Sequence, residues 1–145
     1  MLALATTVMA DPAEHAKAVP ADARWLAVQT ADAASFDGKV LKLTGTAPVV
    51  TLFTDRPYRT AEGLPVKRFI SAWDKGGKHS FAAKPPNADV SIVVDGKMVS
   101  AVVELSAPKL DGTMVSYAVK PTKGTLPASG KSVSLFIDDV CLSCW

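Results

Sequence analysis

The residues with the clearest chemical potential are two cysteines, Cys141 and Cys144, which form a Cys-x-x-Cys pair near the C-terminal end of the sequence. Covalent haem attachment would need a histidine after the second cysteine, where this chain has Trp145. A disulfide formed in an oxidising compartment is the simplest interpretation of the pair. The alternative is a soft metal ion, copper or zinc, bound by both thiolates and by His15, His79 or a methionine.

The N-terminal residues predict export. Residues 1–10 are apolar or small, and Val8, Met9 and Ala10 occupy the positions that a signal peptidase recognises. We therefore expect residues 1–10 to be the remnant of a signal peptide, with cleavage before Asp11, and the mature chain to be periplasmic or secreted. No other segment approaches the roughly twenty apolar residues that a membrane-spanning helix requires. Residues 11–24 are rich in Ala, Pro and Asp and predict a flexible lead-in without a core of its own.

Composition indicates one globular domain over residues 25–138. Hydrophobic residues make up 48% of the chain and charged residues 21%, which is enough apolar material for a core. The sixteen basic and fourteen acidic residues give a net charge of +2, too small to indicate nucleic acid as a partner. Basic residues are nevertheless in local excess between Phe53 and His79. Four of them are candidates for contact with an anion or a partner: Arg56, Arg59, Lys67 and Arg68.

Turn signals between apolar runs predict antiparallel hairpins. Asp-Gly pairs at 37–38, 95–96 and 111–112 favour two-residue type I′ turns, in which both residues have positive φ. In the resulting registers, apolar residues share one face, with a break predicted at residues 106–108. Further strands are predicted at 25–30, with Leu26 and Val28 inward, and at 49–54 and 132–138.

These strands predict a mainly β domain. Seven to eight short strands with close turns are typical of an antiparallel β-sandwich of the immunoglobulin-like type. One segment departs from the pattern: Val66, Phe69, Ile70 and Trp73 recur at helical spacing, after Pro65 at the position of a first helical turn. We expect one short amphipathic helix that closes an end of the sandwich. Residues 139–145 form the remaining tail.

Five stretches of the sequence also carry a resemblance. They are residues 35–38 (SFDG), 53–59 (beginning FTDRP), the predicted helix at 69–73, residues 85–88 (PPNA) and residues 134–138 (SLFID). In these stretches the chain resembles a group of small exported bacterial proteins of uncharacterised function, over about residues 25–138. The resemblance implies one exported domain and implies no mechanism.

Two hypotheses about function follow. The first is a non-enzymatic exported module that binds another protein or itself, without a cofactor, because the sequence contains no recognised catalytic motif. The second is a periplasmic copper- or zinc-binding protein that uses Cys141 and Cys144.

Overall fold

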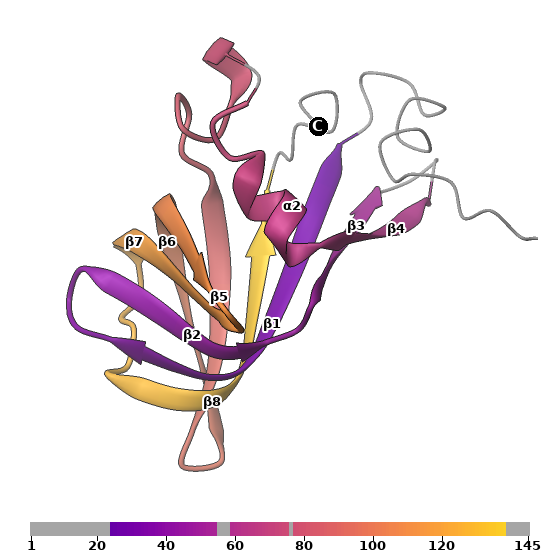
Figure 1. Cartoon of the computed structure of the whole chain (residues 1–145). Coiled ribbons are helices and arrows are strands. Elements are labelled where there is room, and N and C mark those ends of the chain that lie inside the picture. Colours follow the sequence, from indigo (N-terminus) through magenta and orange to yellow (C-terminus); the bar gives the residue numbers. More distant parts are fainter. Residues whose placement is uncertain (1–23, 55–58, 76, 139–145) are drawn as a thin grey trace, which may run out of the picture.

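One antiparallel sheet forms most of the fold (Figure 1). The computed structural model describes residues 24–54, 59–75 and 77–138. Its elements are β1 (Trp25–Phe36), β2 (Val40–Thr46), β3 (Val49–Thr54), β4 (Ala61–Pro65), the helix α2 (Val66–Ser71), the 3-10 helix η1 (Gly77–His79), β5 (Asn87–Val94), β6 (Lys97–Asp111), β7 (Met114–Lys123) and β8 (Ser129–Ile137). The mainly β class with one short α-helix agrees with the sequence prediction.

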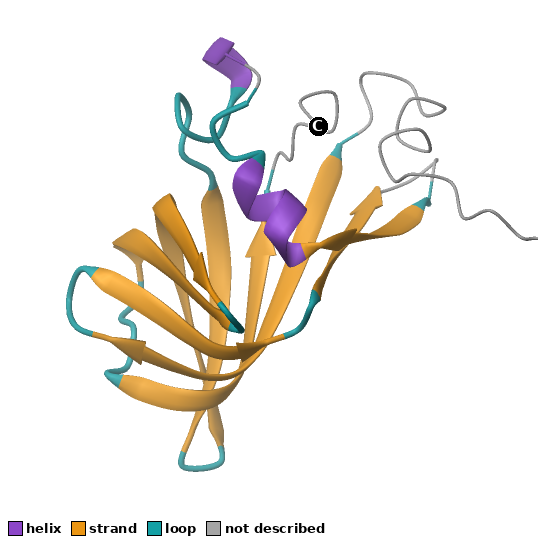
Figure 2. Ribbon diagram, in the orientation of Figure 1, coloured by secondary structure: helices purple, strands orange, loops and turns teal. Residues whose placement is uncertain are grey.

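The sheet closes into a six-stranded barrel because β1 has different partners along its length (Figure 2). One edge of β1 pairs with β8 from Ala27 to Ser35. On the other edge, residues 25–28 pair with β3, whereas residues 31–36 pair with β2. Since β2 also pairs with β7, the strand order β1-β2-β7-β6-β5-β8 returns to β1, and β3 and β4 extend beyond the barrel.

The predicted immunoglobulin-like sandwich is therefore not confirmed. Alternation of apolar residues shows which side of a strand is buried, but it does not show whether two sheets stack or one sheet closes. Irregularities favour closure here, because an extra residue bends a strand and increases its twist. The registers shift within β5–β8 and within β6–β7, the latter between Ser106 and Lys109, where the sequence predicts a break.

The three predicted turns differ in geometry. Asp95 and Gly96 both have positive φ, 49° and 76°, and the flanking Val94 and Lys97 pair as a two-residue turn requires. In the second hairpin, Asp111 instead pairs with Met114, so that Gly112 and Thr113 form the turn.

The third turn contains Asp37 and has a longer loop, because Phe36 pairs with Leu41. The Asp37 side chain accepts hydrogen bonds from the backbone N–H groups of Val40 and Lys39, at 2.7 and 2.9 Å. These bonds lower the pKa of Asp37 because they favour its charged form. The Asp-Gly signal thus predicts the place of each turn better than its type.

The predicted inward face of β1 is wrong. Trp25, Ala27, Gln29 and Ala31 are buried, whereas Leu26 and Val28 are only partly buried and point to the other side of the strand. A six-stranded barrel has a narrow interior, which accepts small residues on some strands where larger residues fill it from others. Leu26 and Val28 consequently lie on the outer surface.

The predicted helix is confirmed and lies across one end of the barrel (Figure 1). It begins after Pro65 and buries Phe69, and Trp73 follows its last turn. The Trp73 ring lies 4.8 Å from that of Phe81 and 5.6 Å from that of Tyr117, between ring centroids. Since Tyr117 lies on β7 and is fully buried, this aromatic cluster joins the helix to the barrel interior.

Candidate functional site

Most metal-ligand candidates lie outside the described residues. This applies to Cys141, Cys144 and His15, so neither the disulfide nor the metal prediction is tested. His79 ends the 3-10 helix η1. Within residues 24–54, 59–75 and 77–138, no group of three histidine, cysteine or acidic residues is arranged to hold a metal ion.

The basic candidates are divided between the two ends of one strand. Arg59 precedes β4, whereas Lys67 and Arg68 lie on α2, which follows β4. A strand rises by about 3.3 Å per residue, so the five residues of β4 separate these positions by roughly 16 Å of backbone. Arg56 lies outside the described residues. The described members of this group therefore do not form one compact site.

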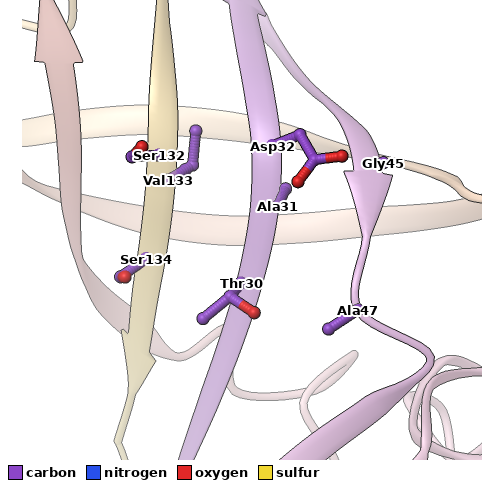
Figure 3. A pocket seen from close by; sticks show the side chains of 8 residues that line it. All are labelled: Thr30, Ala31, Asp32, Gly45, Ala47, Ser132, Val133 and Ser134. Carbon is purple, nitrogen blue, oxygen red and sulfur yellow. The ribbon is translucent and has the colours of Figure 1, made fainter.

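A shallow pocket of about 410 Å³ lies on the barrel wall, where β1 is flanked by β8 and by the end of β2 (Figure 3). Its polar side chains come from two neighbouring strands, Thr30 and Asp32 from β1 and Ser132 and Ser134 from β8. Thr30 pairs directly with Ser134, so the hydroxyl groups of both strands lie on the same face. The remaining lining residues are Ala31, Gly45, Ala47 and Val133.

Gly45 is needed for the shape of this pocket. Its φ of 64° is in the left-handed region, and a Cβ at this position would overlap the carboxylate of Asp32. Figure 3 shows the Asp32 side chain extending from β1 toward Gly45. The regular alternation of buried residues breaks at these two positions, in β1 after Ala31 and in β2 before Thr46.

Gly45→Ala should destabilise the protein more than Gly112→Ala, which replaces a glycine of similar backbone conformation. Gly112 is a matched control, because its φ is 60° and nothing lies within 4 Å of its Cβ position. Both alanines should cost about 1–2 kcal/mol for the left-handed conformation, and overlap with Asp32 should add about 1 kcal/mol at position 45 alone. Urea unfolding measures this excess, which should disappear in an Asp32→Ala background. An excess that persists there would contradict the contact.

Ser132 marks a second irregularity at the same pocket. It is a non-glycine residue with a φ of 51°, a conformation that costs of order 1 kcal/mol or more. Between the pairs Ser91–Ser134 and Val93–Lys131, β8 uses one more residue than β5. This bulge changes the direction of the Ser132 side chain, and bulges frequently occur beside binding sites.

The polar side chains of the pocket have no partners within the part of the chain that the structure describes. Among residues 24–54, 59–75 and 77–138, no hydrogen bond or ion pair involves the side chains of Thr30, Asp32, Ser132 or Ser134. The pocket therefore presents one carboxylate and three hydroxyl groups to solvent. The carboxylate accepts hydrogen bonds and the hydroxyl groups accept or donate them, so the arrangement can bind a polar or cationic group.

An apolar strip adjoins the pocket on the same outer face. It consists of Leu26 and Val28 of β1, Phe53 of β3 and Phe136 of β8, and we refer to these residues as the apolar strip. Leu26 pairs with Phe53, and Val28 pairs with Phe136. Phe136 is 46% exposed, although it is a large aromatic side chain. An exposed apolar strip beside polar groups is typical of an interaction surface.

Two parts of the sheet have opposite net charge. The strands around the apolar strip, β5, β8, β1, β3 and β4, contain three acidic residues and one basic residue: Asp32, Glu62, Asp89 and Lys131. The other three strands have the opposite excess: Lys42, Lys97, Lys109, Lys120 and Lys123 against Glu104 and Asp111. Asp89 pairs with Phe136 at the border of the strip. The five strands around the strip thus have a net charge of −2 in a protein of net charge +2.

Sequence reasoning missed both the pocket and the strip. The alternation of residues 25–30 predicts Leu26 and Val28 inward, whereas the structure places them on the outer face. Two signals indicate the pocket: Gly45 interrupts a strand, and the alternation of apolar residues fails around Ser132. Neither signal shows that the two irregularities lie side by side, because that depends on the pairing of β1 with β8.

Comparison with protein-family models gives no match, and neither do comparisons with curated proteins and with solved structures. None of the described helices has the length and apolar character needed to cross a membrane.

Proposed function

We propose that this chain is an exported, non-enzymatic module that binds another protein on its outer face, along the apolar strip. One observation carries the proposal: Val28 and Phe136 form a partly exposed apolar pair beside a pocket whose polar side chains have no partner among the described residues. An apolar centre bordered by polar groups is the common anatomy of protein interfaces, in which buried aromatic side chains contribute much of the affinity.

The barrel interior supports binding at the surface rather than inside. Side chains from every strand of the barrel fill it, among them Leu41, Leu105, Tyr117 and Leu135, which are fully buried. Helix α2 and its aromatic cluster cover one end. Small barrels of this kind are filled by their own side chains, so their ligands are bound on outer surfaces.

The first test is photo-crosslinking at Phe136 in the cells that produce the protein. Phe136→p-benzoylphenylalanine retains an aromatic group and places the reactive carbonyl on the apolar strip. We expect one protein to be crosslinked there, identified by mass spectrometry, and Val28→Lys to lower the yield about tenfold or more, because a lysine beside Phe136 would have to be buried at the interface.

Met98 provides the matched control for this experiment. It is 72% exposed and lies on β6, away from the strip. The same photoreactive residue at position 98 should not crosslink the same protein, and Met98→Lys should leave crosslinking at position 136 unchanged. Equal labelling from both positions would contradict the proposal, and crosslinking only to a second copy would show self-assembly instead.

A further inference from the structure

The pocket beside the apolar strip has several hydrogen-bond acceptors. Its described lining residues include no lysine or arginine side chain. The Asp32 carboxylate only accepts, and the hydroxyl groups of Thr30, Ser132 and Ser134 can accept as well. Lys131 is next to Ser132 in sequence, yet within the described residues it forms no ion pair with Asp32. Ammonium and guanidinium groups are donors only, and they form their strongest hydrogen bonds with carboxylates.

The position of the pocket relates it to the strip. On the outer face of β1 and β8, the pair Thr30–Ser134 is the next pair after Val28–Phe136, two residues along each strand. Two residues of a strand span about 7 Å, so a protein segment lying against Phe136 would have its neighbouring side chains at the pocket. The carboxylates of Asp32 and Asp89 both border this surface, which favours the approach of a basic partner.

From this geometry we propose that the pocket binds a lysine or arginine side chain of the protein that covers the apolar strip. The inference rests on the proposed function and specifies the chemistry of the partner. An isolated small cation in such an open pocket gains no more than about fivefold in affinity from Asp32, because water screens the attraction. A cation presented by a protein gains more, because the surrounding contacts exclude water from the pair.

The chemistry of the pocket can be measured without the partner. The probes are n-butylammonium chloride, which resembles a lysine side chain, and n-butanol, its neutral analogue, each titrated into ¹⁵N-labelled full chain at constant ionic strength. We expect n-butylammonium to shift the amide resonances of Gly45, Ser132 and Ser134, with affinity about fivefold higher than that of n-butanol. Equal responses to the two probes would overturn the inference.

Asp32→Asn tests the role of the carboxylate, since it keeps the size of the side chain and removes the charge. It should weaken n-butylammonium binding about fivefold and leave the response to n-butanol unchanged. Asp95→Asn is the control, because it removes one charge in a turn where asparagine accepts the positive φ. An affinity for n-butylammonium that is the same in both variants would also overturn the inference.

Crosslinking at position 136 then separates this inference from the proposed function. Asp32→Asn should lower the yield of the crosslinked protein about fivefold below saturation, whereas Asp95→Asn should not. If n-butylammonium binds but Asp32→Asn leaves crosslinking unchanged, the pocket binds free amines and the inference is wrong, while the proposed function stands. If no protein is crosslinked although n-butylammonium binds, the proposed function fails and the assignment to a partner side chain fails with it.

Discussion

Trp73→Ala should destabilise the protein by about 3–5 kcal/mol, the cost of removing a large buried aromatic side chain. Trp73 is 5% exposed and contacts the rings of Phe69, Phe81 and Tyr117. It is the residue through which helix α2 reaches the side chains inside the barrel, so its loss leaves a cavity at the covered end. Urea unfolding with linear extrapolation measures the change in the free energy of unfolding.

Trp73→Phe is the informative second variant, because one group of the indole lowers the stability of the folded protein. Its Nε1–H group is buried and has no hydrogen-bond partner among the described residues. Such an orphaned donor costs about 1–3 kcal/mol, and phenylalanine removes it while keeping an aromatic ring in the cluster. Trp73→Phe should therefore cost less than half as much as Trp73→Ala. Met98→Ala, at an exposed position, should change stability by no more than about 0.5 kcal/mol. Equal losses for alanine and phenylalanine would contradict this account.

Local features of the fold could be predicted because they depend on neighbouring residues. The hairpin of β5 and β6 has the expected register, with Ile92 opposite Val99, because the Asp95–Gly96 turn and the alternation of apolar residues agree. The helix was found for a similar reason, since four apolar residues recur at its spacing. In both cases a few adjacent residues contain the whole signal.

Closure of the barrel could not be predicted, because it depends on pairs distant in sequence. Ala27 pairs with Ile137, and Leu41 pairs with Tyr117, across most of the domain. Gln29 shows the same limit for a side chain: it is fully buried, although it is polar and the neighbouring apolar residue Val28 points outward. Only its partner on β7 explains this burial.

The candidate site was missed because it is formed by two irregularities on different strands. Asp32 and Ser132 are about one hundred residues apart in sequence, and each looks like an ordinary polar residue of a strand. The pairing of β1 with β8 places them on the same face. The more obvious candidates, the Cys-x-x-Cys pair and the basic residues around Arg56, lie wholly or partly outside the described residues, so their roles stay predictions.

Tyr117→Phe removes only the hydroxyl group of the side chain. It should nevertheless destabilise the protein by about 1–3 kcal/mol at neutral pH. The Tyr117 O–H group donates a hydrogen bond of 2.7 Å to Gln29 Oε1, and both side chains are fully buried. Gln29 Nε2 already lacks a partner among the described residues, so the variant would leave the whole amide without a hydrogen bond. In a Gln29→Met background, which removes the acceptor and leaves the buried phenol O–H without a partner, the same change should instead stabilise the protein, and urea unfolding of the four proteins tests this reversal of sign.

The same tyrosine should make the protein lose stability in alkali. Burial raises the pKa of Tyr117 far above its ordinary value of 10.0, and the hydrogen bond to Gln29 offsets this only in part. The neutral phenol is therefore favoured by folding, and its contribution is fully present below pH 10. Above pH 10 the unfolded chain loses the proton and the folded chain keeps it, so stability falls by about 1.4 kcal/mol per pH unit from this group.

Comparison with Tyr117→Phe isolates this effect, because the variant retains every other titrating group, including the second tyrosine, Tyr58. The free energy of unfolding of the parent should fall by about 2.3 kcal/mol more than that of the variant between pH 10 and pH 12, since the unfolded tyrosine is already half ionised at pH 10. Parallel pH profiles would mean that Tyr117 ionises in the folded protein, which would require water to reach the interior of the barrel. A steeper fall in the parent would show instead that the end covered by Trp73 and α2 excludes water from the barrel interior.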